Sequence, residues 1–250
     1  MLKEQRLKVI RQLLETTGMI KVSDIMEKLD VSDMTVRRDL DELEKSGILT
    51  RVHGGARLKD LYRIEELSHD EKQIVNIDKK RAIARQASRL IKKDETIFLG
   101  PGTTIEMLAE EISLDSLRIV TNCWPVFERL NKKKSSNSKI YLLGGEMRLK
   151  TQSFFGELVN TPLTNMKFHK AFFSCNALNE NEVMTSTLEE GQTQTLALDN
   201  SLETYLLLDS SKLGKRDFCV YYQLKDITSV IIDDGARNVP WLDQESTYFA

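Results

Sequence analysis

The stretch 31-VSDMTVRRDL-40 sets two adjacent arginines and a threonine among regularly spaced apolar residues. At about 100° per residue, Val36, Leu40 and Leu43 fall on one stripe of a helix. The remaining side chains project from the other sides of that helix: Met34, Thr35, Arg37 and Arg38. A solvated surface helix carries similar charges. The neighbouring segments therefore decide whether this basic face is merely solvated or is shaped to fit a charged partner.

Two further helices are predicted before this one. Residues 4–15, EQRLKVIRQLLE, repeat apolar residues at helical spacing, and this helix is predicted to end near Thr17, before a glycine. Residues 22–30, VSDIMEKLD, predict a short second helix with Ser23 as N-cap. Ser32 then caps the third helix after a very short turn. Two helices joined in this way, the second with arginines near its start, are typical of a helix-turn-helix whose recognition helix enters the DNA major groove.

A basic β-hairpin is predicted directly after the recognition helix. In residues 45–58, KSGILTRVHGGARL, Gly47 ends the helix and Gly54-Gly55 suit a two-residue turn, because both positions can take φ > 0. Such a hairpin is a wing that can contact DNA phosphates. The alternative is a three-helix module that binds protein. The predicted DNA contacts of the winged unit are Ser32, Met34, Thr35, Arg37, Arg38, Arg51, His53 and Arg57.

Overall charge does not attract this chain to nucleic acid. The 250 residues hold 36 Lys and Arg against 38 Asp and Glu, a net charge of −2. Residues 1–60 hold 12 Lys and Arg against 11 Asp and Glu, a net charge of +1. DNA affinity must therefore come from the local placement of cations, and a homo-oligomer, either a dimer or a tetramer, would multiply the contacts.

Several classes of protein are not favoured by the sequence. The charged start MLKEQRLK lacks the apolar core of a signal peptide, and no run of 18 apolar residues occurs, so we expect a cytoplasmic protein without a membrane partner. Three widely separated cysteines are predicted to be buried thiols rather than a disulfide framework: Cys123, Cys175 and Cys219. The three histidines are isolated from one another, and we expect no metal site and no cofactor: His53, His69 and His169.

The sequence divides into two domains and a linker. Residues 1–57 form the predicted winged helix-turn-helix domain, and the polar, highly charged residues 58–75 are predicted to be a linker. In residues 76–250 helical and strand patterns alternate, which predicts βαβ units and a mainly parallel sheet. The expected fold class is therefore α/β, with a winged head followed by a larger domain that we assign to effector binding and oligomerisation.

A glycine-rich loop follows the first predicted strand of this larger domain. After ETIFL come Gly100-Pro101-Gly102-Thr103-Thr104 and then a helical pattern. Glycines let backbone N–H groups face one point, and a helix N-terminus adds partial positive charge, which suits a phosphate monoester. The loop lacks the Walker lysine and the third glycine of a dinucleotide fingerprint. Taken alone, it is equally typical of a tight turn without ligand.

Polar residues also follow three other predicted strands. Asn122 follows RIVT, Gly144-Gly145 follow IYLL with Arg148 close by, and Lys212 lies just after YLLLD. Ligands of open α/β sheets gather at the carboxyl ends of strands. Four such ends together predict a site for a polyhydroxylated anion.

The segment 32-SDMTVRRDLDELEKSGILTRVHGGA-56 closely resembles the signature of the DeoR family of bacterial repressors. The resemblance continues through GTT, TN, LLGG-x-x-R, SFxG and DSSK and covers nearly the whole chain. It implies operator DNA as partner, an effector domain whose sheet is similar to that of ribose-5-phosphate isomerase, and release of DNA by a phosphorylated sugar. The effector residues implied by the motifs and the strand ends are Gly100, Gly102, Thr103, Thr104, Asn122, Gly144, Gly145, Arg148, Glu190 and Lys212.

Two positions depart from the pattern of the family. The family commonly has Asp-Ser where this chain has Gly100-Pro101, and a lysine where it has Gln194. The segments FLGPGTT, TNCWPVF, YLLGGEMR and NEVMTS resemble the branch of the family that regulates lactose catabolism. This finer resemblance implies tagatose 6-phosphate as the effector.

Three functions compete for this architecture. We expect a repressor of sugar catabolism genes; the alternatives are a sugar-phosphate isomerase-like enzyme with an accessory DNA-binding head and a DNA-binding protein whose second domain is a ligand-free scaffold. An isomerase needs a base placed near the substrate carbon. Four acids are candidates, and the sequence places none of them as a base: Glu146, Glu189, Glu190 and Asp209. We therefore expect no enzymatic activity.

Overall fold

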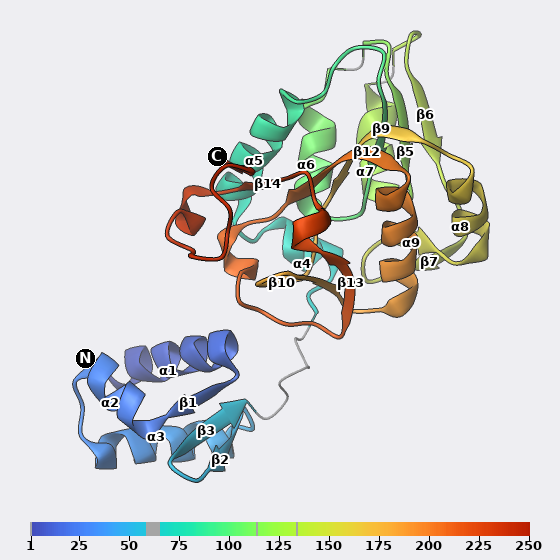
Figure 1. Ribbon diagram of the computed structural model, residues 1–250. Helices are drawn as coiled ribbons and strands as arrows, with labels where there is room; N and C mark the ends of the chain where they lie inside the picture. Colours follow the sequence, from blue (N-terminus) through green and yellow to red (C-terminus); the bar gives the residue numbers. More distant parts are fainter. Residues whose placement is uncertain (1, 59–65, 114, 134) are drawn as a thin grey trace. The chain divides into compact units, whose positions relative to one another are not determined.

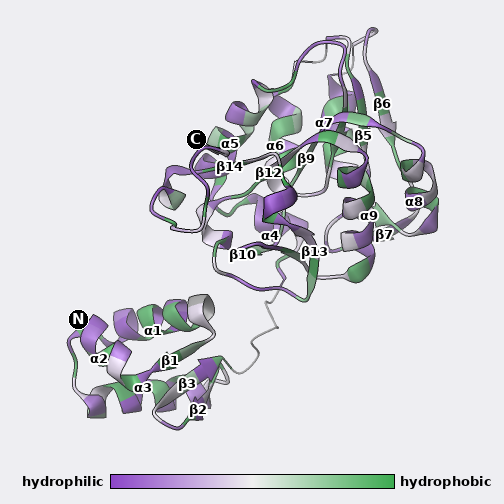
Figure 2. Ribbon diagram, in the orientation of Figure 1, coloured by the Kyte–Doolittle hydropathy of each residue, from purple (hydrophilic) through white to green (hydrophobic). Residues whose placement is uncertain are grey.

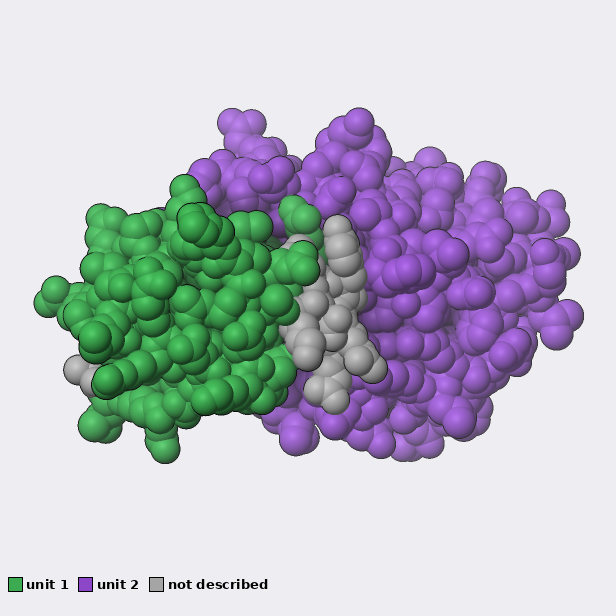
Figure 3. Space-filling view, turned by 90° about the horizontal axis from the view of Figure 1, so that it is seen from below, with its two compact units in different colours: residues 1–65, 214–216 green, residues 66–213, 217–250 purple. Residues whose placement is uncertain are grey.

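The computed structural model describes residues 2–58, 66–113, 115–133 and 135–250. The chain forms two compact units, shown in different colours in Figure 3: residues 1–65 with 214–216, and residues 66–213 with 217–250. Residues 66–75, predicted from the sequence to be linker, thus belong to unit 2. The rest of the predicted linker, apart from Leu58, lies outside the described residues.

Unit 1 is a winged helix-turn-helix, as predicted. Figure 2 shows hydrophobic and hydrophilic residues alternating along its first helix. The hydrophobic faces of the helices meet in one core, in which Ile10, Ile25, Val36 and Leu40 are fully buried. The elements of unit 1 are α1 (Lys3–Thr17), β1 (Met19–Lys21), α2 (Val22–Leu29), α3 (Asp33–Lys45), β2 (Leu49–Val52) and β3 (Gly55–Leu58) (Figure 1).

The predicted N-cap of α3 is confirmed, and the predicted N-cap of α2 is wrong. Ser32 Oγ accepts a hydrogen bond from the backbone N–H of Thr35 at 3.4 Å, as an N-cap does. The N-cap of α2 is Lys21, not Ser23. The reason is β1, which the sequence did not reveal: it carries the chain in extended form up to Lys21, and the N–H of Val22 donates to the carbonyl of Gly54 at 2.9 Å.

The wing is confirmed, but its turn lies one residue earlier than predicted. Val52 pairs with Gly55, so the two-residue turn is His53-Gly54, and of the two glycines only Gly54 takes a positive φ, +75°. Gly55 begins β3, the central strand of the three-stranded sheet β1-β3-β2. A Cβ at Gly55 would lie 2.3 Å from the carbonyl oxygen of Ile20. Glycine is therefore required here by the close approach of β1, not by a left-handed turn.

A partly buried ion pair fixes α1 against the recognition helix. Arg6 donates from Nε to Asp39 Oδ2 at 2.8 Å and from Nη2 to Asp39 Oδ1 at 3.1 Å. Asp39 is only 3% exposed, on the inner face of α3. Such a two-bond contact constrains orientation as well as distance. The outer face of α3 is thereby held in one direction relative to the rest of unit 1.

Unit 2 is built on a seven-stranded sheet in which every pairing is parallel, which confirms the predicted fold class. Its strand order is β15-β14-β12-β9-β4-β5-β6. Because the strands are parallel, their carboxyl ends lie on the same edge. The strands are β4 (Thr96–Leu99), β5 (Arg118–Thr121), β6 (Lys139–Leu142), β9 (Phe168–Phe173), β12 (Ser201–Leu207), β14 (Ser229–Ile232) and β15 (Thr247–Phe249).

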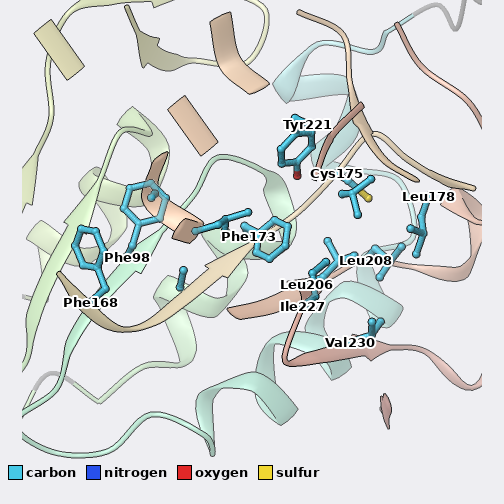
Figure 4. Close-up of a cluster of buried hydrophobic side chains, with 14 of the residues drawn as sticks. Phe98, Phe168, Phe173, Cys175, Leu178, Leu206, Leu208, Tyr221, Ile227 and Val230 are labelled. Carbon is cyan, nitrogen blue, oxygen red and sulfur yellow. The ribbon is translucent and has the colours of Figure 1, made fainter. Parts of the chain in front are cut away.

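Helices cover both faces of this sheet. Ile97 and Leu99 of β4 point to the core shared with α5 (Ile77–Ser88), α6 (Thr103–Glu111) and α7 (Trp124–Lys132). Phe98, between them, points to the opposite core, shared with α8 (Glu157–Thr164) and α9 (Leu188–Asp199). Figure 4 shows Phe98 in this second core, where Phe168 and Phe173 also lie. Burial on both faces explains why the strands read as continuous apolar runs.

Several shorter elements of unit 2 were not predicted from the sequence. The first is α4 (His69–Gln73), and β7 (Glu146–Arg148) pairs with β8 (Ser153–Phe155) as an antiparallel hairpin. A small antiparallel sheet contains β10 (Ala177–Asn179), β11 (Glu182–Thr185) and β13 (Cys219–Gln223). Among the described residues there are also three 3₁₀ turns: η1 (Ser210–Lys212), η2 (Leu224–Asp226) and η3 (Asp234–Ala236).

The structure also bears on the cysteines and on membrane-spanning helices. The three cysteines are free and buried, as predicted. Within the described ranges, no helix combines the length and the apolar character that a membrane span needs.

The contact between Gly55 and β1 yields a prediction about the wing. We expect Gly55→Ala to destabilise the three-stranded sheet by about 1–3 kcal/mol, the usual cost of forcing extra atoms into a packed site. Gly54→Asn is the matched control, because nothing lies within 4 Å of its Cβ position and Asn tolerates a positive φ. Amide hydrogen exchange of β3 in the full chain measures the local opening free energy. Equal protection in the two variants would contradict the role given to Gly55.

Candidate functional site

The outer face of α3 presents the residues predicted to contact DNA bases. Met34 is 65% exposed, and Arg37 and Arg38 are exposed beside it. Arg37 Nε donates to Asp33 Oδ2 at 2.6 Å, one helical turn away. Arg38 has no hydrogen-bond or ion-pair partner within the described residues, so its guanidinium is free to pair with the edge of a base.

The three basic residues of the wing differ in availability. His53, in the turn, and Arg57, in β3, are exposed. Arg51 is tied to α3, because its Nη1 donates to Asp41 Oδ1 at 2.6 Å and to the carbonyl of Arg37 at 3.2 Å. The geometry thus gives Arg51 a structural task, namely fastening the wing to the recognition helix, and its contact with phosphate stays a prediction.

A cavity of about 60 Å³ lies in unit 2, where β4 and β9 end. Its walls include four of the predicted effector residues: Gly102, Thr103, Glu190 and Lys212. It also contains residues that the sequence did not single out as effector contacts, among them Glu66 and Lys72 from the start of unit 2 and Ser174 and Asn176 after β9. Of the four strand ends predicted to meet, those of β4 and β12 contribute residues to the cavity, whereas the predicted residues after β5 and β6 do not line it.

The start of α6 forms one wall of this cavity. Gly102, with φ +130°, precedes the helix, and its carbonyl accepts from the N–H of Glu106 at 2.9 Å. The first N–H groups of a helix have no partner within it and carry partial positive charge. A Cβ on Gly102 would lie 3.3 Å from the Cβ of Ser174, so the loop passes close to the chain after β9. This wall suits an anion.

Two lysines from different elements line the cavity, Lys72 and Lys212, and a third, Lys80, contacts the backbone of Lys72. Lys212 Nζ donates to Ser174 Oγ at 3.2 Å and to the carbonyl of Cys175, and Lys72 Nζ donates to Asn176 Oδ1 at 3.0 Å. Burial lowers the pKa of Lys72. For Lys80, whose Nζ donates to the carbonyl of Lys72 at 2.5 Å, burial and then the charge of Lys212 lower the pKa to about 8. The mutual repulsion of these cations favours an added anion.

The two buried acids nearest to the cavity are already engaged. Glu66, 9% exposed, faces Arg148, whose Nη2 donates to its Oε2 at 2.5 Å and whose Nη1 donates to its Oε1 at 3.0 Å. Glu190 accepts from four side chains: Arg148 Nη1 at 2.8 Å, Thr151 Oγ1 at 2.5 Å, Ser153 Oγ at 3.0 Å and Thr187 Oγ1 at 2.9 Å. Arg148 therefore links the two acids at the edge of the cavity.

A further buried acid anchors α4, the helix that carries Lys72. Glu106 of α6 bonds His69 Nε2 at 2.9 Å through Oε2 and accepts from Arg129 Nε at 2.8 Å through Oε1. Gln73 Nε2 also donates to Oε2, at 3.0 Å. Burial acts to raise the pKa of Glu106, but these hydrogen bonds outweigh it and lower the pKa to about 2. The carboxylate is thus ionised and holds α4 and α7 against α6.

Six predicted effector residues do not line the cavity, and one of them, Arg148, contacts its walls only through Glu66 and Glu190. Thr104 is buried in α6, and Gly100 borders the side chain of Gln194. Asn122 Nδ2 donates to the carbonyl of Phe154 at 2.8 Å. Gly144 and Gly145 precede the β7–β8 hairpin, and a Cβ at Gly145 would lie 2.9 Å from the carbonyl oxygen of Phe155. Asn122 and Gly145 thus position the hairpin that carries Arg148.

The most important residues missed by the sequence reasoning lie in the predicted linker. Glu66, His69 and Lys72 belong to a folded segment whose helix is only five residues long. A signal was present, because Ser68 and Glu71 form a capping box in which each side chain bonds the other's backbone N–H. The high density of charged residues favoured the prediction of a linker over that of a helix.

A larger cavity, of about 490 Å³, lies at the amino ends of β14 and β15. Its described lining includes Ser229 and Thr247, one cation, Lys225, and two acids, Glu180 and Asp243. Such a balance of charge does not favour an anionic ligand. Among the described residues, no group of three or more His, Cys, Asp or Glu side chains is placed to hold a metal ion.

Comparison with known proteins gives matches to both units. A model of the DeoR-like helix-turn-helix domain matches residues 6–61, and a model of the DeoR C terminal sensor domain matches residues 75–234. The lactose phosphotransferase system repressor of Streptococcus mutans is 52% identical over 233 residues, 93% of each chain. That of Staphylococcus aureus is 51% identical over 231 residues, 92% of each chain. Ribose 5-phosphate isomerase A of Methanocaldococcus jannaschii is 17% identical, with a TM-score of 0.40 over 55% of each chain.

Proposed function

Because the chain belongs to the DeoR family of bacterial regulators, we propose that it represses genes of sugar catabolism and leaves its operator when a phosphorylated sugar binds. At the coarser level it is a DNA-binding repressor of the DeoR type and not an enzyme. The observation that carries the sensing function is the cavity in which the start of α6 meets Lys72 and Lys212.

A sugar phosphate matches the charge of this cavity. It carries about −1.5 to −2 near neutral pH, by analogy with a phosphorylated side chain. The N–H groups at the start of α6 and the ammonium of Lys212 would hold the phosphate, and the amide and hydroxyl groups of the remaining walls would hold the sugar. Tagatose 6-phosphate is the proposed effector, since the relatives that share about half of the sequence are named for the lactose phosphotransferase system.

The geometry argues against the isomerase alternative. Glu190 accepts four hydrogen bonds, so its lone pairs are occupied. Asp209 Oδ1 accepts from Asn76 Nδ2 at 2.9 Å and from the N–H of Ser211 at 3.1 Å, and its pKa is lowered, since the charge of Lys212 and these bonds outweigh burial. A general base must reach a substrate proton. The oxygens of Glu190 are occupied by their donors, and Asp209 is held by Asn76 and Ser211 and does not line the cavity.

Control of DNA binding requires two linked equilibria. A homo-oligomer, at least a dimer, would place two α3 helices about 34–36 Å apart, or at a multiple of that distance, on successive major grooves. Effector binding then changes how the two heads are presented. Such coupling is typically about 1–3 kcal/mol and is reciprocal, so operator DNA weakens effector binding by the same factor.

The free guanidinium of Arg38 predicts its role in operator recognition. We expect Arg38→Ala to lower the preference for operator over scrambled DNA by about 1–3 kcal/mol, the usual contribution of a specific base contact. Arg57→Ala, on the wing, should instead weaken binding to both DNAs alike, because phosphate contacts carry no sequence information. Binding to both DNAs is measured at one salt concentration. An unchanged ratio in Arg38→Ala would exclude Arg38 as a base reader.

The charge of Lys212 predicts its role in the effector response. We expect Lys212→Ala to bind operator normally but to require about tenfold to a hundredfold more tagatose 6-phosphate for release, since a charge-assisted hydrogen bond contributes about 1.5–3 kcal/mol. Lys225→Ala removes the same charge from an exposed position and serves as control. The measurement is a titration of the repressor–operator complex with the phosphosugar. A response at wild-type concentrations would place Lys212 outside the site.

A further inference from the structure

Gln194 is a buried amide without a partner. It lies in α9, one turn after Glu190, and is only 4% exposed. Neither its Nε2 nor its Oε1 has a hydrogen-bond partner among the described residues. Native structures seldom leave a buried polar group unpaired, because its lost hydration is not replaced. An unpaired amide of this kind on the wall of a cavity indicates a missing ligand.

The structure makes room for this amide at the cavity wall. Gln194 lines the same cavity as Gly102, Thr103 and Lys212. A Cβ at Gly100 would lie only 2.6 Å from Gln194 Oε1, so the absence of a side chain at Gly100 lets the carboxamide lie where it does. Two features, a glycine and an unpaired amide, thus define one position.

A carboxamide offers one acceptor and two N–H donors and no net charge, so its natural complement is a neutral hydroxyl or carbonyl. The cations that suit the phosphate come from other elements: Lys72 from α4 and Lys212 from η1. We propose that Gln194 binds a hydroxyl or carbonyl oxygen of the sugar and thereby selects which sugar phosphate is accepted. This inference rests on the proposed function and assigns a residue to the sugar end of the ligand.

The test compares Gln194→Leu with Gln192→Leu, an exposed position on the same helix. Affinities for tagatose 6-phosphate and for inorganic phosphate are measured by calorimetric titration, together with the melting temperature without ligand. Gln194→Leu should lose about tenfold to a hundredfold in affinity for the sugar phosphate, the usual range for an unmatched polar contact. It should keep its affinity for inorganic phosphate and melt no lower than the wild type, because an apolar side chain leaves no unpaired amide.

Each other outcome has a definite meaning. Wild-type affinity of Gln194→Leu for tagatose 6-phosphate would overturn the inference, and so would an equal loss of affinity for both ligands with a lower melting temperature, which indicates a structural role. A wild-type protein that does not bind tagatose 6-phosphate would overturn the proposed effector and this inference together.

A different observation concerns Glu66, whose carboxylate lies where an anionic ligand would be held. It is bound by Arg148 through two bonds, by Lys72 Nζ at 3.4 Å and by Asn176 Nδ2 at 3.3 Å. Burial acts to raise the pKa of Glu66, but Arg148 and Lys72 outweigh it and lower the pKa. An anion that uses Lys72 meets this carboxylate as a competitor of like charge.

The size of the cavity leads to the same conclusion. Sites for small organic ligands usually enclose about 300–1,000 Å³, whereas this cavity, with Glu66 on its wall, encloses about 60 Å³. Space for a sugar phosphate therefore requires a wall to move. When Glu66 leaves, Arg148 keeps its bond to Glu190, and Lys72 loses its bond to Glu66 and becomes available to the incoming anion.

The position of Glu66 in the chain gives this movement a consequence. Glu66 is the first residue of unit 2, directly after the segment that joins it to unit 1. We infer that Glu66 is an internal competitor of the effector and that its displacement transmits occupancy of the cavity to the DNA-binding unit. The state with Glu66 in place is the state that binds operator.

The test uses Glu66→Gln, with Glu146→Gln, an exposed acid of unit 2, as the control for net charge. Removing the competitor should raise the affinity for tagatose 6-phosphate about tenfold and weaken operator binding in the absence of effector, because both changes follow from a shift toward the effector-bound state. Lys212→Ala should lower effector affinity without that effect on the operator. Effector affinity that is unchanged or lower in Glu66→Gln would overturn the inference, even where the wild type responds to the sugar phosphate.

Discussion

One buried carboxylate holds the sensing unit together at the point where it begins. Glu106 on α6 bonds His69 and Gln73 of α4 and Arg129 of α7. A helix as short as α4 is not stable in isolation. Its helical conformation therefore depends on this contact. Because α4 is fixed, Lys72 and Glu66 have defined positions at the cavity. The positions of these two charged side chains at the cavity thus depend on hydrogen bonds of Glu106, a residue that does not line the cavity.

The site itself balances cations against acids, and this balance distinguishes sensing from catalysis. Arg148 is shared by Glu66 and Glu190, and Glu190 is saturated by hydroxyl donors. An enzyme of sugar phosphates needs a base with a free lone pair. A sensor needs only a difference in binding free energy between two states. At Glu190 the structure has the second arrangement, in which charge can be redistributed but the lone pairs of the carboxylate are already taken.

The sequence predicted whatever depends on long periodic patterns and strong local signals. Such patterns can be buried in only one favourable way. Examples are Val36 and Leu40, on one stripe of a helix, and the apolar runs around Phe98 and Leu206. The predictions failed where contacts between distant segments decide the local structure. Ser23 is not the N-cap of α2, because β1 extends the chain up to Lys21, and Gly55 is a glycine because a neighbouring strand lies against it. The cavity lies at the predicted edge of the sheet, but only four of the predicted effector residues line it: Gly102, Thr103, Glu190 and Lys212. The other lining residues were missed because hydrogen bonds between distant segments leave no periodic pattern in the sequence.

Internal pairing in unit 1 also affects how the protein searches for DNA. Arg6, Arg37 and Arg51 are each bound to an aspartate of α3 or of its first turn: Asp39, Asp33 and Asp41. Each arginine held in this way releases fewer counterions from DNA, and counterion release is the main source of affinity for random sequence. A single head should therefore hold non-cognate chromosome weakly and with a shallow dependence on salt. The population of free repressor then stays available to its operator, where several heads and a specific contact act together.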